Sequence, residues 1–179
     1  MKQNNYIKIL SFVLAALLAC LLVTQLLPFW NCSDCKTHPE GDKMLSIAEY
    51  ILFPLDHKTV TNNMTQLYKE LYGEDLRDAQ GRKWTFTVDE ILMCPLLVLV
   101  GCLLGIVFCL VMENKLYGLF AGAVAGVSGV VGYLIYLPLQ WGVNWQLHLV
   151  AAGIVTVVAV PALVHTLVVS IKAYLAKYK

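Results

Sequence analysis

Charge is scarce in this 179-residue chain, of which only 14% is Asp, Glu, Lys or Arg. A soluble globular domain carries about 25% charged residues, so the composition excludes an ordinary water-soluble protein. The shortage is concentrated in four long apolar blocks, which contain no charged residue except Lys8 at the polar end of the first. Ion and proton pathways through membranes normally use buried charged groups. The apolar blocks therefore lack the buried charged residues that a self-sufficient pump or ion-coupled transporter normally uses.

The four apolar blocks are long enough to cross a bilayer, for which a helix needs about 20 mostly apolar residues. They cover residues 7–29, 91–112, 116–137 and 145–171. We therefore predict one domain over residues 1–179: an all-α integral membrane protein, a four-transmembrane-helix bundle. The lipid bilayer is its expected surrounding, other membrane subunits or a second copy are the expected partners, and no nucleic acid is expected.

The first block also has features of a signal peptide, because Lys2 and Lys8 precede an apolar run. The residues "LLAC", Leu17–Cys20, fit a lipoprotein cleavage site, which would lipidate Cys20. The run continues as "LLVTQLLPFW", however, and a mature lipoprotein normally turns polar after its cysteine. The sequence favours a retained span and leaves lipidation of Cys20 open.

The positive charges of the short connections indicate the orientation in a cell membrane. Lys115 in the second short connection would share one side with the N-terminal tail and the C-terminal tail, whose lysines are Lys2, Lys8, Lys172, Lys177 and Lys179. The long segment of residues 30–90 has seven Lys and Arg against eleven Asp and Glu, but a loop of about 60 residues is translocated regardless of charge. We expect both termini to be cytoplasmic and residues 30–90 to be extracytoplasmic.

Small residues recur every four positions in the third block and so lie on one face of a helix. Such faces allow helix backbones in lipid to approach closely. They predict packing either within the bundle, which is favoured, or against a helix of another subunit. The predicted helix-packing residues are Gly101, Gly105, Gly118, Gly122, Gly126 and Gly129.

The last block contains two histidines, and an ionisable residue inside a membrane is a functional hypothesis by default. His148 lies near the outer end, whereas His165 lies deeper, towards the inner face. A neutral histidine bonded to a hydroxyl or carbonyl group is the simpler interpretation of His165. The alternative is a small transporter or channel subunit, in which an oligomer lines its pathway with His165 and Pro161.

The outer segment has an ordinary soluble composition and predicts a small mixed α/β structure. Aromatic and β-branched residues in "SIAEYILFP" (46–54) favour a strand. Met64, Leu67, Tyr68 and Leu71 lie on one face of an amphipathic helix closed by Gly73. The alternating "KWTFTV" (83–88) suggests a second strand, and "TVDE" (87–90) matches a capping box before the second span.

The motif "CSDCKTH" permits three kinds of site. Cys32, Cys35 and His38 could be three metal ligands, but structural zinc needs four. Cys32 and Cys35 could be a redox pair, since this spacing can lower a thiol pKa, with Cys94 as a resolving thiol. A local Cys32–Cys35 disulfide in an oxidising compartment is favoured over both. No cofactor is expected.

Two resemblances follow from these features. A four-span bundle with a surface cysteine pair resembles, in topology, the quinone-linked thiol oxidases of the disulfide-bond and vitamin K reductase type, which would imply a membrane thiol-disulfide oxidoreductase. The order of elements, with "LPFW" closing the first span, "FPLDHK" in the loop and "NW" before the last span, is similar to that of uncharacterised four-span integral membrane proteins of anaerobic bacteria. No function comes with that likeness. The sequence favours a non-enzymatic accessory or scaffolding subunit that acts through helix–helix and outer-loop contacts.

Overall fold

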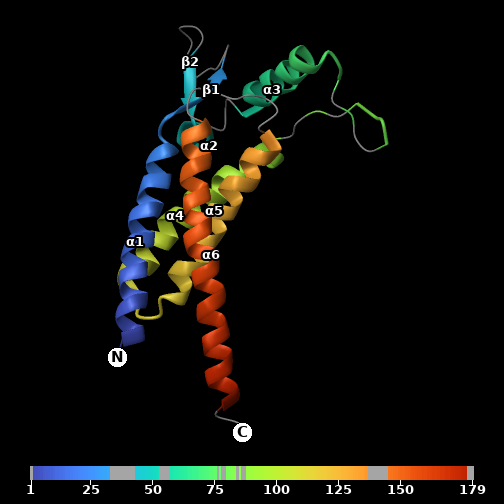
Figure 1. The fold of residues 1–179 in the computed structure, drawn as a ribbon. Coiled ribbons are helices and arrows are strands. Elements are labelled where there is room, and N and C mark those ends of the chain that lie inside the picture. The colour runs from blue at the N-terminus through green and yellow to red at the C-terminus, as the bar shows by residue number, and fades with distance from the viewer. Residues whose placement is uncertain are drawn as a thin grey trace.

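The computed structural model describes residues 2–32, 43–52, 57–75, 77, 80–83, 85, 88–136 and 145–176. Helices dominate these residues (Figure 1). The elements in chain order are α1 (Lys2–Thr24), β1 (Pro28–Cys32), β2 (Lys43–Ser46), α2 (Ile47–Leu52), α3 (His57–Tyr72), α4 (Val88–Val111), α5 (Leu116–Tyr136) and α6 (Trp145–Ala176).

Four long helices form the bundle, in which α5 packs against α4 and α6 while α1 packs against α4 and α6. Three of them are long and apolar enough to cross a membrane, over Tyr6–Thr24, Leu92–Val111 and Gln146–Ala176. Helix α5 carries a shorter apolar stretch, Leu116–Gly132. An all-α fold with membrane-length helices is therefore confirmed, whereas a fourth span remains a prediction.

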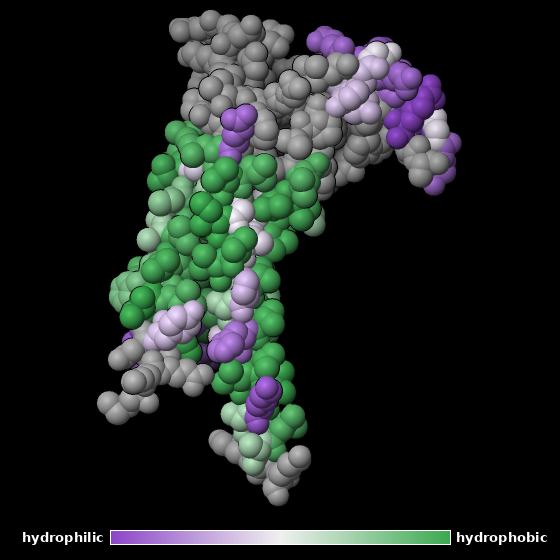
Figure 2. Space-filling model, in the orientation of Figure 1, coloured by the Kyte–Doolittle hydropathy of each residue, from purple (hydrophilic) through white to green (hydrophobic). Residues whose placement is uncertain are grey.

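Apolar side chains cover the outside of the bundle as well as its interior. Phe12 and Val157, for example, are 66% and 72% exposed. Figure 2 shows this apolar surface along the helices, with hydrophilic residues gathered around α3 and the segment that follows it. A soluble monomer rarely exposes such large contiguous apolar patches, so the surface is compatible with a membrane location.

The core of the bundle combines leucines from α1 with small side chains from the other helices. Leu14, Leu18 and Leu21 are fully buried, and they meet residues such as Cys102 and Ala125. These small side chains let the helix backbones approach closely, which is how helices associate in lipid.

Helix α1 ends at Thr24, five residues before the end of its apolar block. The amide groups of Gln25, Leu26 and Leu27 bond to carbonyls three residues back, at 3.0–3.3 Å, which tightens the chain into turns. Pro28 has no amide hydrogen with which to continue a helix. The chain then enters β1, which pairs antiparallel with β2.

The predicted strand over residues 46–54 is wrong, because Ile47–Leu52 form helix α2. Its start is a capping box. The amide of Glu49 donates to Ser46 Oγ at 3.1 Å, and Glu49 Oε2 accepts from the Ser46 amide at 2.7 Å. These reciprocal bonds outweigh the strand preference of the aromatic and β-branched residues that follow.

Helix α3 confirms the predicted amphipathic helix and extends it back to His57. It closes at Gly73, whose φ of 69° is left-handed and whose amide bonds to the Lys69 carbonyl at 2.9 Å. Helix α4 begins at Val88, within the predicted capping box. Half of the predicted strand over residues 83–88 lies outside the described residues; of the other half, Lys83 forms an isolated bridge with Arg77 and Val88 begins α4.

Candidate functional site

A buried polar cluster joins the outer ends of α1 and α6. Thr24 at the end of α1, Gln25 just after it and His148 in the first turn of α6 are 7%, 0% and 2% exposed. His148 Nδ1 lies 2.7 Å from Thr24 Oγ1. The amide nitrogen of Gln25, Nε2, lies 2.8 Å from His148 Nδ1 and 3.1 Å from His148 Nε2.

One arrangement of protons satisfies the Thr24 contact together with the 3.1 Å contact between Gln25 Nε2 and His148 Nε2, and it leaves the 2.8 Å approach of Gln25 Nε2 to Nδ1 without a hydrogen bond. Thr24 Oγ1 donates to the Leu21 carbonyl at 2.6 Å, so it accepts from Nδ1–H of His148. His148 Nε2 is then free of hydrogen and accepts from the Gln25 amide. The imidazole is neutral in this arrangement, as suits a buried histidine, because an ionised group is costly to bury.

The oxygen of the Gln25 side chain, Oε1, is buried without a hydrogen-bond donor among the described residues. An unsatisfied buried acceptor costs about 1–3 kcal/mol. A single water molecule would satisfy it, because buried waters normally bond to such otherwise unpaired groups.

The same cluster fixes the outer segment to the bundle. The backbone carbonyl of Gln25 accepts a hydrogen bond from the Ala48 amide of α2 at 3.0 Å. Ile47 and Ala48 are themselves only 3% and 8% exposed. We call Thr24, Gln25, His148 and the Ala48 amide the polar junction; it joins α1, α2 and α6.

The glycines of α5 lie against neighbouring helices of the same chain. A Cβ atom on Gly126 would come within 2.8 Å of the Thr156 amide nitrogen of α6, and one on Gly129 within 2.7 Å of Ala152 Cβ. Near the start of α5, a Cβ on Gly118 would meet Cys109 of α4. The small-residue face of α5 is thus occupied within the bundle.

The remaining predicted packing glycines have similar surroundings. A Cβ on Gly101 would approach Ala125 Cβ to 2.9 Å, and one on Gly105 would come within 2.6 Å of Leu18 Cδ1. Gly122 faces α1, because a Cβ atom on Gly122 would lie 3.0 Å from Leu14 Cδ2. Both helix α4 and helix α1 therefore rely on glycine positions to approach their neighbours.

The connection between α4 and α5 is a short hairpin held by polar groups. Lys115 Nζ donates to the Cys109 carbonyl at 2.8 Å, which caps the C-terminal end of α4. The Leu116 amide donates to Asn114 Oδ1 at 3.1 Å. These bonds satisfy backbone groups that the ends of helices leave unpaired.

His165 lies apart from the polar junction, in a groove between the inner halves of α1 and α6 that Pro161 also lines. The groove has a volume of about 430 Å³. The two histidines of α6 thus have opposite surroundings, because His148 is buried and His165 is exposed.

The cysteine motif falls largely outside the described residues. Cys32 ends β1, where it is paired with Lys43, but Cys35 and His38 lie in the range that the structure does not describe. Cys94 is a free thiol on α4 and lies against Gly132 of α5. Across the described ranges, no three His, Cys, Asp or Glu side chains gather to hold a metal ion.

Cys20 lies on a continuous helix. The chain that follows it includes Leu21, Thr24 and Gln25, all of which are buried within the bundle or the polar junction. Cys20 itself is exposed on the outside of α1 as a free thiol.

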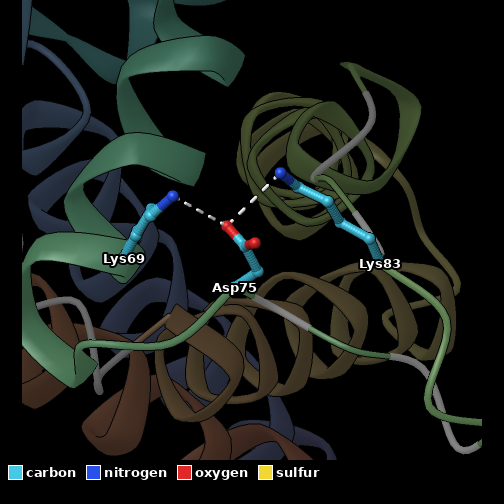
Figure 3. A network of polar contacts seen from close by, with 3 residues as sticks. All are labelled: Lys69, Asp75 and Lys83. Atoms are coloured by element: carbon cyan, nitrogen blue, oxygen red, sulfur yellow. Dashed lines mark ion pairs between the residues drawn. The ribbon is translucent and has the colours of Figure 1, made fainter.

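A network of charges lies in the outer segment (Figure 3). Asp75 Oδ1 lies 3.3 Å from Lys69 Nζ and 3.4 Å from Lys83 Nζ. The hydrogen bond from Lys69 is the main cause of the lowered pKa of the Asp75 carboxyl group; burial opposes it, and the hydrogen bond from Lys83 and the charges of both lysines add to the lowering. The network ties the end of α3 to the residues that precede α4.

Thr24 and Gln25 were not among the predicted site residues. Both lie within an apolar block, where two adjacent polar residues before a proline were the only available signal. Comparison of the chain with protein-family models, with curated protein sequences and with solved structures gives no match. The arguments for function therefore depend on the geometry of this chain alone.

Proposed function

We propose that the chain is a non-enzymatic, four-span membrane subunit that holds its outer segment on the bundle and acts through contacts of that segment with other membrane proteins. The observation that carries the proposal is the polar junction. The buried polar side chains of Gln25 and His148 join the end of α1 to the start of α6. The backbone carbonyl of Gln25 accepts a hydrogen bond from α2 and so fixes α2 at the same place. Such bonds hold the outer segment in one position relative to the helices.

The surface offered to a partner is the solvent-exposed side of α3. Its exposed residues follow helical spacing, whereas His57 and Thr61 on the other side are buried. Polar groups spaced three or four residues apart share one face of a helix, and they can form specific bonds to a partner. Among the described side chains of α3, the exposed polar residues are Lys58, Asn62, Gln66, Lys69 and Glu70.

The orientation belongs to the same proposal. Helix α5 has 21 residues and a length of about 31 Å at 1.5 Å per residue, which matches the hydrocarbon thickness of about 30 Å. With α5 as a fourth span, both termini lie in the cytoplasm. Residues 30–90 then lie outside.

Site-specific crosslinking tests the proposal. A photo-crosslinking residue at Gln66, on the exposed side of α3, should capture one discrete membrane protein in intact cells. The same residue at Thr61, on the buried side, is the matched control and should capture none. Gentle extraction that yields this chain alone, with no crosslinked product from Gln66, would refute the proposal.

Cysteine labelling tests the orientation separately. In a variant with serine at Cys32 and Cys35, Glu74→Cys should react with a membrane-impermeant maleimide in intact cells. Lys172→Cys should react only after the cells are permeabilised. The reverse pattern would place the outer segment in the cytoplasm.

A further inference from the structure

The groove between α1 and α6 has the size of a binding site for a small molecule. Its volume of about 430 Å³ lies within the roughly 300–1,000 Å³ typical of ligand pockets. The walls are helices rather than loops, which gives the groove a stable shape. Among its lining residues are Tyr6 and Leu10 of α1 and Val157, Pro161, His165 and Thr166 of α6.

The two ends of the groove differ in polarity. Helices α1 and α6 run in opposite directions and are joined at the polar junction, so Leu10 of α1 and Val157 of α6 are the lining residues nearest to that junction on each helix, and both are apolar. Tyr6 lies towards the inner end, with His165 and Thr166. Thr166 Oγ1 donates to the Ala162 carbonyl at 2.7 Å, so its lone pairs and the imidazole of His165 are left to face the groove.

The groove lies where the two helices separate, on the side of the polar junction towards the two termini. The polar junction holds their outer ends together, and the ribbons diverge towards the two termini (Figure 1). The lining includes Pro161, which lacks an amide hydrogen and removes the helix bond to the Val157 carbonyl. Ala162, beside it, is too small to fill the space.

Positive charge lies beyond the polar end of the groove. Lys172 follows His165 by seven residues, so it lies on the same side of α6, two turns further along. Lys177 and Lys179 follow, and the sequence from His165 to its end contains no Asp or Glu. Basic clusters at the end of a membrane helix attract anionic lipid headgroups.

We infer that this groove binds one anionic phospholipid. An acyl chain occupies the apolar end at Leu10 and Val157, and the phosphate lies near His165, with Lys172 supplying the charge. This order of apolar wall, polar side chains and cations matches the order of groups along a phospholipid. The inference rests on the membrane location in the proposed function, and it does not require any protein partner.

Native mass spectrometry of the purified full-length chain in detergent tests the inference. Phosphatidylglycerol and phosphatidylcholine with identical chains are the two probes. We expect one molecule of phosphatidylglycerol to bind, at least tenfold more tightly than phosphatidylcholine. Equal binding of the two lipids would overturn the inference, while the crosslinking test of the proposed function would be unaffected.

Two variants with matched controls locate the site. Ala162→Phe should fill the groove and abolish binding of the single lipid, whereas Ile154→Phe, at an exposed position on the same helix, should not. Lys172→Gln should weaken phosphatidylglycerol binding about fivefold, since a lysine near anionic lipid contributes about 1 kcal/mol. Lys58→Gln, in the outer segment, should leave it unchanged.

Each remaining outcome is also decisive. Loss of binding in both phenylalanine variants, or in neither, would place the lipid elsewhere. Conversion of a dimer to a monomer by Ala162→Phe would show that a second copy fills the groove. If Ala162→Phe does not fold, Thr166→Val and His165→Ala together take its place, and unchanged phosphatidylglycerol binding in that pair would overturn the inference.

Discussion

The membrane-length bundle and the outer segment are stabilised by opposite means. In the bundle, glycines at positions such as Gly126 and Gly118 let helices approach until backbone atoms touch. In the outer segment, buried apolar residues such as Ile47 are joined by polar contacts: the Ser46–Glu49 capping box and the ion pairs of Asp75. The polar junction at His148 lies at the boundary between the bundle and the outer segment.

This difference has a physical origin. In lipid, hydrophobic burial does not distinguish helix contact from lipid contact, so close packing is the main driving force. In water, short helices such as α2 need their ends satisfied, because isolated helices of this length are marginal. Substitutions that enlarge a side chain should therefore destabilise the bundle most. Substitutions that remove a polar group should mainly destabilise the outer segment.

The largest expected effect is that of Gly126→Leu. A side chain here meets the backbone of Thr156, which cannot move aside as a flexible side chain would. We expect the free energy of unfolding, measured by denaturant titration in bicelles, to fall by about 3 kcal/mol. Gly153→Leu is the control, because no atom lies within 4 Å of its Cβ position; an equal loss there would refute the packing argument.

His148→Ala should be next in size, because it leaves Thr24 and Gln25 buried without their imidazole partner. Unsatisfied buried groups cost about 1–3 kcal/mol, and we expect a loss of about 2 kcal/mol. Hydrogen exchange at the Ala48 amide should also become faster, since the junction holds α2. Gln146→Ala, at an exposed site in the same turn of α6, should change neither quantity; a similar response in both variants would contradict the assigned role.

Ser46→Ala should destabilise only the outer segment. The substitution removes the hydroxyl that accepts from the Glu49 amide, and loss of such a cap typically costs about 1 kcal/mol. Hydrogen exchange within α2 should accelerate, while exchange in α4 and α5 should remain unchanged. Ser170→Ala, at an exposed position on α6, is the control, and faster exchange in the bundle would count against independent stabilisation of the two regions.

The smallest effect should be that of pH on the Asp75 network. Because the folded-state pKa is lowered, the stabilisation is fully present above the unfolded value of about 3.9 and is lost as pH falls through the folded value. An NMR titration of the Asp75 carboxyl carbon should show the lowered pKa, and Lys69→Ala should raise it towards normal. An unchanged titration in Lys69→Ala would show that this ion pair is not formed in solution.

The sequence predicted the long helices well, because their apolar blocks are longer than any strand. The strand expected at residues 46–54 failed because β-propensity was weighed above "SIAE", whose Ser and Glu are spaced for a capping box. Thr24 and Gln25 were missed for a different reason. Their partner, His148, follows more than 120 residues later, and no pattern in a single sequence indicates which helix ends will meet.

The unequal lengths of α1 and α6 affect the kind of bilayer that suits this protein. Helix α1 has 23 residues and α6 has 32, which correspond to about 35 Å and 48 Å. Natural membranes differ by a few ångströms in hydrocarbon thickness, and mismatch costs fractions of a kcal/mol per ångström. In a thin bilayer α6 must tilt or project while α1 fits, and in a thick bilayer α1 is the strained member. Membrane thickness therefore acts unequally on the two helices that the polar junction joins, and would change the angle between them.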